Sequence, residues 1–178
     1  EFNPYVYRRI NGKAVRKDLA AAHELMRRAG YANGIDAPTG KALILYYDTT
    51  ASGPDDKARM NWMRKQFAKI GVQLVIRSSD YNRFQEKMRK GTGQIFMWGW
   101  NADYPDPENF LFLLYGPNGK TQHGGENAAN YQNVEFDALF VQMKNMENGA
   151  ERQQIIDRMV EILRHDAPWA WGFFPKAF

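Results

Sequence analysis

The spacing of apolar residues alternates along this chain between the period of a strand and the period of a helix, and this alternation constrains the fold most. Short apolar runs at residues 42–47, 72–76 and 95–100 have the character of strands. Amphipathic helical patterns over residues 54–70 and 80–90 separate them, and each ends at a glycine. Connections of this length are too long for hairpins. The pattern therefore predicts an α/β fold in which a parallel or mixed sheet is covered by helices.

The flanking regions are predicted to contain both irregular stretches and helices, and the 178 residues fit one domain, 1–178. In chain order we expect irregular residues 1–15, a helix over 16–29, an irregular stretch 101–130 with a short helix at 110–115, two helices around 134–148 and 155–163, and a last strand over 169–173.

Composition excludes several classes of protein. The chain has no cysteine, which rules out disulfides and thiolate metal sites, and no apolar run is long enough for a transmembrane helix. The net charge of +4 gives a pI near 9.2. The basic pairs are scattered in the sequence with acidic residues among them, which favours a solvated surface over a phosphate-binding patch. We therefore expect no nucleic acid partner.

Most catalytic motifs are missing. None of the three serines lies in G-x-S-x-G, there is no P-loop, and the three histidines lack metal-ligand spacing. We therefore expect no metal, no cofactor and no enzyme activity. One alternative remains, a carboxylate-based hydrolase, because Asp103 and Asp106 are two carboxylates close together.

Residues 98–110 form the most unusual stretch of the chain. It follows directly on a predicted strand, and the carboxyl ends of strands are where open α/β sheets place their ligand crevices. Gly99 leaves room for another backbone. Trp98 and Trp100 are each expected either to pack in the core or to line a cleft. Asp103 is expected either to cap the following turn or to pair with a ligand cation.

This stretch resembles a known family. Residues 100–111 match W-x-A-D-Y-P-D-P-x-N-F-L, the signature region of the extracellular solute-binding proteins of the peptide/nickel family, which serve ABC importers. Four shorter pieces also resemble the family, two before this region and two after it, and all lie in the family's order. They are R-A-G-Y-A-N-G at 28–34, Q-F-A-K-I-G-V at 66–72, Y-Q-N-V-E-F-D at 131–137 and D-A-P at 166–168. In the third piece, Val134 replaces the usual proline.

The resemblance implies a periplasmic-binding-protein-like lobe from a type II-like parent whose two lobes close on a ligand. Residues 1–178 would be the second, C-terminal lobe, with the first lobe absent. The absence of an initiator Met at Glu1 fits a piece of a longer chain, with any signal peptide outside it. The implied partners are a small solute and the membrane permease of an ABC importer. The implied location is periplasmic, or extracellular with a lipid tether.

The resemblance also implies a site. In peptide-binding members, the aspartate at the position of Asp103 pairs with the terminal ammonium of the peptide. The preceding backbone, here Gly99, Trp100, Asn101 and Ala102, pairs with the extended peptide by strand addition. Trp98 is expected to lie beside them. The same motif occurs in relatives that bind oligosaccharides or nickel chelates, so a non-peptide ligand stays an alternative.

Overall fold

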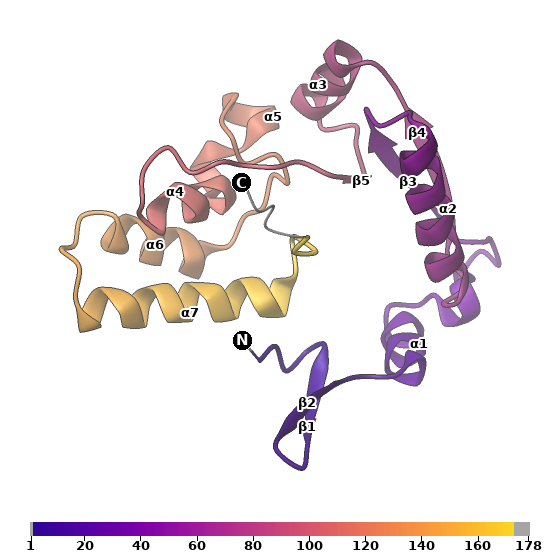
Figure 1. The fold of residues 1–178 in the computed structure, drawn as a ribbon, viewed down its shortest axis with the longest axis horizontal. Coiled ribbons are helices and arrows are strands. Elements are labelled where there is room, and N and C mark those ends of the chain that lie inside the picture. Colours follow the sequence, from indigo (N-terminus) through magenta and orange to yellow (C-terminus); the bar gives the residue numbers. More distant parts are fainter. Residues whose placement is uncertain (1, 173–178) are drawn as a thin grey trace. The chain divides into compact units, whose positions relative to one another are not determined.

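The computed structural model describes residues 2–172. The contacts of the chain group into two compact units, Glu1–Gly99 and Trp100–Phe178. The first unit runs from indigo to magenta in Figure 1 and contains all the strands of the described residues. The second contains only helices among the described residues.

The first unit begins with a hairpin that the sequence analysis missed. Strand β1 (Tyr7–Ile10) pairs antiparallel with β2 (Lys13–Arg16). Asn11 and Gly12 connect them with φ of 49° and 77°. A type I′ turn needs positive φ at both central residues, and Asn-Gly is the dipeptide that adopts it most readily. The prediction of an irregular segment over residues 1–15 is therefore wrong, although the Asn-Gly dipeptide in the sequence indicates a hairpin turn.

Helix α1 (Leu19–Arg28) follows, within the predicted helix over residues 16–29, but it begins three residues later than predicted because Arg16 belongs to β2. Asp18 caps its first turn by accepting a hydrogen bond from the backbone N–H of Ala21 at 3.2 Å. Gly30 takes a φ of 87° just beyond its end, and a single 3-10 turn, η1 (Ala32–Gly34), leads toward the sheet.

The sheet of the first unit is parallel and has the order β4-β3-β5. Strand β3 (Ile44–Thr49) lies in the middle, with β4 (Gln73–Ser78) on one side and β5 (Ile95–Phe96) on the other. Helix α2 (Pro54–Ala68) connects β3 to β4, and α3 (Tyr81–Lys90) connects β4 to β5. The α/β alternation predicted from the sequence is confirmed.

Strand β5 is shorter than predicted. Only Ile95 and Phe96 pair with β3, opposite Tyr47 and Asp48. The next residue, Met97, would lie opposite Thr49, the last residue of β3, but it is not part of β5. The predicted strand over residues 95–100 stops after two residues, so Trp98 and Trp100 lie beyond its end.

Two of the quoted sequence pieces meet in the first unit. A Cβ placed on Gly34 would lie 2.0 Å from the carbonyl oxygen of Gly71, and one placed on Gly71 would lie 2.3 Å from the carbonyl oxygen of Asn33. Both glycines also have positive φ, 73° and 82°. The backbones touch here, which only glycine permits. This contact joins the loop after α1 to the turn between α2 and β4.

The second unit is a helical packing around one apolar core. Its longest helices are α6 (Val134–Met143) and α7 (Ala150–Asp166), which pack on each other and on the short α4 (Glu108–Leu111). The connections contain η2 (Phe112–Leu114), η3 (Gly116–Asn118) and α5 (Lys120–His123). The core consists of Leu111, Leu114, Phe136, Phe140, Met143, Ile156, Met159, Ile162 and Leu163.

Helix α6 begins as predicted. The side chain of Asn133 accepts a hydrogen bond from the N–H of Phe136 at 3.0 Å. Val134 occupies the first helical position and is 89% exposed. A proline is suited to that position, so a valine there changes little.

The predicted last strand is not present in the part of the chain that the structure describes. Residues 169–172 form no strand, and Phe173 lies outside the described residues. Trp169 and Trp171 instead pack edge to face, with ring centroids 5.3 Å apart. Within residues 2–172, no helix has the length and apolar character needed to cross a membrane.

Candidate ligand-binding segment

The six predicted site residues form one continuous stretch, residues 98–103, which we call the ligand segment and in which all residues except the half-buried Trp100 are exposed. It follows β5 at the carboxyl edge of the parallel sheet. The chain passes from β3 to β4 on one side, and the connection through α3 then crosses β3 to place β5 on its other side. Ligands of open α/β sheets bind where the strand order reverses in this way. The boundary between the two units lies between Gly99 and Trp100, so the ligand segment belongs in part to each.

In the first unit, Trp98 is 38% exposed and its ring lies 5.6 Å from that of Phe84 on α3. Gly99 is exposed, and a Cβ placed on it would meet none of the described atoms within 4 Å. Trp98 is therefore not a core residue, and the space that Gly99 leaves is open.

In the second unit, a buried amide organises the rest of the ligand segment. Asn109 on α4 is 2% exposed. Its Oδ1 accepts hydrogen bonds from the indole N–H of Trp100 at 2.9 Å and from the backbone N–H of Asp103 at 3.1 Å. The Trp100 ring is half-buried and packs edge-on against Phe112, at 5.3 Å between centroids. The sequence analysis did not identify Asn109 as a site residue, although it is part of the same motif, six residues after Asp103.

The Asp103 carboxylate is exposed. Among the hydrogen bonds of residues 2–172 it takes part in one, accepted from Nδ2 of Asn109 at 3.4 Å. No backbone N–H of the described residues donates to it, so the structure does not show the capping role. The backbone groups of Gly99, Asn101 and Ala102 also form no hydrogen bond within residues 2–172.

Asp106 has the capping role that was considered for Asp103 from the sequence. It accepts a hydrogen bond from the backbone N–H of Glu108 at 2.8 Å, and its two oxygens receive Arg152 at 3.0 and 2.7 Å. Arg152 on α7 is buried, and it also donates to the carbonyl of Met143 at 3.1 Å and to Asn148 at 2.7 Å. This network fastens the end of the signature region to α7.

The electrostatics of Asp106 oppose an acid–base role. The hydrogen bonds from Arg152 hold the pKa of the Asp106 carboxyl below its usual range. A general acid of a hydrolase needs a raised pKa so that it keeps its proton near neutral pH. Asp106 therefore acts as a structural anchor in this geometry.

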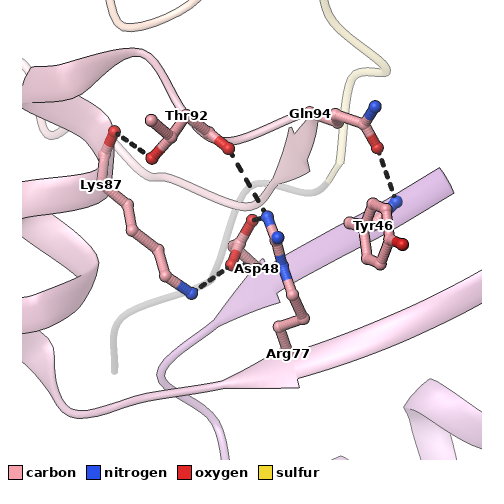
Figure 2. Close-up of polar contacts among 6 residues, drawn as sticks. All are labelled: Tyr46, Asp48, Arg77, Lys87, Thr92 and Gln94. Atoms are coloured by element: carbon pink, nitrogen blue, oxygen red, sulfur yellow. Dashed lines mark hydrogen bonds and ion pairs between the residues drawn. The ribbon is translucent and has the colours of Figure 1, made fainter.

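A second network lies on the N-terminal side of the ligand segment. It consists of Asp48, Arg77 and Lys87, and we call it the Asp48 cluster (Figure 2). Asp48 on β3 is fully buried. Its carboxylate receives Lys87 Nζ at 2.6 Å and the guanidinium of Arg77, with Nε at 3.1 Å. Burial raises the pKa of Asp48, but the hydrogen bonds from both cations lower it more, so its carboxyl stays ionised.

The Asp48 cluster also holds the chain that leads into β5. Arg77 reaches the carbonyl of Thr92 at 3.5 Å and lies over the Tyr46 ring at 4.7 Å. The side chain of Gln94 accepts a hydrogen bond from the backbone N–H of Tyr46 at 2.9 Å. Strand β5 forms only two residue pairs with β3. The contacts of Arg77 and Gln94 therefore help this short pairing to fix where the ligand segment begins.

No metal site is evident in the part of the chain that the structure describes. Residues 2–172 contain no group of three or more His, Asp or Glu side chains placed to hold an ion.

Comparison with known proteins identifies the family. Residues 2–122 match the family model for the middle region of bacterial extracellular solute-binding proteins, family 5. The chain belongs to this family, which confirms the resemblance read from its motifs. Members of the family are periplasmic or extracellular solute-binding proteins rather than enzymes.

Individual relatives agree with this assignment. The chain is 29% identical to heme-binding protein A of Haemophilus influenzae, over 85% of this chain and 26% of that protein. It is 27% identical to di/tripeptide-binding protein 4 of Pseudomonas aeruginosa, over 90% of this chain and 29% of that protein. The chain therefore spans between a quarter and a third of the length of these relatives.

Solved structures support the fold. The periplasmic binding protein DppA of Helicobacter pylori, in complex with the peptide STSA, matches 94% of this chain with a TM-score of 0.70 and 26% identity. The match covers 30% of that protein. HbpA2 of Haemophilus parasuis matches with a TM-score of 0.72 and 22% identity over the same shares. The fold is thus that of one lobe of a periplasmic binding protein.

Proposed function

We propose that this chain is the second, C-terminal lobe of a solute-binding protein that captures a peptide-like solute and delivers it to the permease of an ABC importer. The observation that carries the proposal is the state of Asp103. Its carboxylate is exposed, it has a single long hydrogen bond within the described residues, and the buried Asn109 holds its backbone. Such a carboxylate is available to a ligand cation.

The chemistry of the ligand segment fits an extended peptide. An ammonium that meets the Asp103 carboxylate in a closed cleft forms a charge-assisted hydrogen bond, which strengthens as water is excluded. The backbone groups of Gly99, Trp100, Asn101 and Ala102 would pair with the peptide main chain by strand addition, and those of Gly99, Asn101 and Ala102 form no hydrogen bond within residues 2–172. Main-chain pairing does not read side chains, so many peptide sequences are accepted. Trp98 adds an aromatic surface beside them.

The first lobe would supply the other wall of the cleft. Closure of two lobes around a ligand is a change that a permease can recognise. The 178-residue chain alone is expected to fold and to bind weakly, because half of the contacts are absent. The complete protein, meaning the polypeptide that also contains the remaining length of the relatives, is expected to act in the periplasm or on the outer face of the cell membrane.

A thermal-shift screen of the complete protein tests the proposal. The panel holds di- to pentapeptides, oligosaccharides, heme and nickel chelates, because a ligand that binds the native state raises Tm by mass action. Each measurement is repeated with Asp103→Asn and with the control Asp55→Asn, an exposed carboxylate at the start of α2. We expect a peptide shift that Asp103→Asn removes and Asp55→Asn keeps.

One relative favours a second candidate, a non-peptide solute. The relative at 29% identity is named a heme-binding protein. Such a ligand has no terminal ammonium to pair with Asp103. A shift with heme, a chelate or a sugar that survives Asp103→Asn would support transport of that solute and contradict the peptide proposal.

A further inference from the structure

The net positive charge of this chain is concentrated in one segment near its N-terminus. Five cations and no acidic residue lie in residues 7–17, which we call the basic hairpin. Because this segment carries +5 and the whole chain carries +4, all other residues together carry −1. The cations are Arg8, Arg9, Lys13, Arg16 and Lys17. The expectation of scattered basic pairs does not hold here, since pairing of β1 with β2 brings two of those pairs together.

The register distributes these cations over both faces of the basic hairpin. Tyr7 lies opposite Arg16 and Arg9 opposite Ala14 on one face, and Arg8 lies opposite Val15 and Ile10 opposite Lys13 on the other. Every cation of the two strands therefore faces an uncharged residue. Each face combines two cations with at least one large apolar side chain.

The basic hairpin is exposed throughout. All eight residues of β1 and β2 are exposed, and its large apolar side chains, Tyr7, Ile10 and Val15, are between 36% and 44% exposed. The hairpin has one weak ion pair, Arg8 with Asp18 at 3.8 Å, and Arg9 lies over the ring of Phe2 at 4.8 Å. A two-stranded hairpin is at best marginally stable in water, so this element gains from a surface that covers it.

Charge and composition define that surface. Five cations, of which Arg8 has one long ion pair with Asp18, attract a dense anionic surface. A specific protein partner would need one complementary face, but both faces here have the same mixed character. Tyrosine and aliphatic side chains between cations suit the level of lipid headgroups, where aromatic rings are enriched and each Lys or Arg is attracted to anionic lipid. We propose that the basic hairpin docks on the anionic phospholipid headgroups of a membrane. This inference does not depend on the ligand segment.

Co-sedimentation of the 178-residue chain with vesicles tests it. The vesicles consist of phosphatidylcholine alone or with phosphatidylglycerol added. We expect binding only when phosphatidylglycerol is present, weakening as salt rises. The triple variant Arg8→Gln/Arg9→Gln/Lys13→Gln is expected to lose about 100-fold in partition coefficient, since about 1 kcal/mol per cation is about five-fold each.

A matched control variant removes the same charge elsewhere. Arg64, Lys65 and Lys69 lie exposed at the end of α2, and their triple change to Gln lowers the net charge equally. We expect the fold-reduction in partition coefficient for this control to be less than a tenth of that for the triple variant of the basic hairpin. A second variant, Tyr7→Ser/Ile10→Ser, is expected to weaken vesicle binding without any change of charge. Circular dichroism checks that all variants keep the helical content of the parent.

Three results would overturn the inference. One is the absence of binding to phosphatidylglycerol vesicles at low salt. Another is an equal loss in the α2 control, which would show a general charge effect. The third is tighter binding to duplex DNA than to vesicles at the same salt, which would assign the basic hairpin to a nucleic acid.

Discussion

The two ends of the ligand segment are held by ion pairs of opposite construction. In the first unit the buried partner is a carboxylate, Asp48, and its cations Arg77 and Lys87 reach solvent in part. In the second unit the buried partner is a cation, Arg152, and the carboxylate of Asp106 is the partner that reaches solvent. The comparison shows that the chain on each side of residues 98–103 is held by an ion pair with one buried partner. Within the ligand segment, the Asp103 carboxylate is exposed, and the backbone groups of Gly99, Asn101 and Ala102 form no hydrogen bond within residues 2–172.

The largest effect is expected from the buried cation. Arg152→Leu removes the pair with Asp106 and leaves the carbonyl of Met143 without its donor. Because Asp106 reaches solvent in part, the cost arises from the lost charged hydrogen bonds and from the buried Met143 carbonyl left without a donor, each about 1–3 kcal/mol of unfolding free energy. Hydrogen exchange should increase in α6 and α7 but not in β3 or α3. Gln153→Leu, an exposed neighbour on α7, is the control. Equal exchange in both units would contradict separate anchoring.

A smaller effect is expected from the buried carboxylate. Asp48→Asn keeps the size of the side chain but leaves Arg77 and Lys87 uncompensated. Because both cations reach solvent, we expect a loss of about 2 kcal/mol, at the scale of hydrogen bonds to charged groups. Exchange should increase in β5 and α3 only.

Lysine changes on one helix provide the matched control for the Asp48 cluster. Lys87→Met removes a cation of the cluster, whereas Lys90→Met removes an exposed lysine on the same helix that pairs with Glu86. Lys87→Met should speed exchange in β5 and Lys90→Met should not. If the two variants behave alike, the cluster does not position the start of the ligand segment.

These anchors were only partly predictable from the sequence. The predicted start of the helix after Asn133 and the predicted glycine end of α3 agree with the structure, because short-range contacts decide them. The Asp48 cluster joins residues 29 and 39 positions apart, and the Asp106–Arg152 pair spans 46. Such contacts depend on strand register and helix packing, which periodicity does not determine.

The errors have similar causes. The length of β5 depends on which β3 residues it pairs with, here Tyr47 and Asp48, and these lie outside the β5 sequence itself. The placement of Asp103 as an exposed residue that does not cap a turn depends on Asn109 and Asp106, which share its motif but differ in burial. The hairpin at Asn11-Gly12 is different, because its turn dipeptide is a local signal. The family resemblance located the ligand segment, but it did not indicate what holds it.

Asn109→Ala sharpens the comparison inside the second unit. It leaves the N–H groups of Trp100 and Asp103 without their acceptor, which costs about 1–3 kcal/mol when such donors are buried. The larger consequence is expected for the ligand, with peptide affinity of the complete protein falling while α6 and α7 keep their exchange rates. A loss of stability in α6 and α7 with unchanged affinity would assign Asn109 a purely structural role.

The smallest effect is a difference in acid stability. The pKa values of Asp48 and Asp106 are both lowered in the folded chain, so each contributes stability above the unfolded value near 4 that is lost as pH falls through the folded value. Denaturant unfolding between pH 6 and about 3 should therefore show a shallower loss for Arg152→Leu than for the parent. An identical slope would show that Asp106 gains nothing from Arg152.

Peptide capture through Asp103 is tested most directly by calorimetric titration of the complete protein. One titrant is a tripeptide with a free N-terminus, and the other is the same tripeptide acetylated there. A hydrogen bond to a charged group contributes about 1.5–3 kcal/mol, so acetylation should weaken binding by about 10- to 100-fold. Asp103→Asn should bind both peptides equally and weakly. If the wild-type protein binds both peptides with the same affinity, Asp103 does not receive the ammonium.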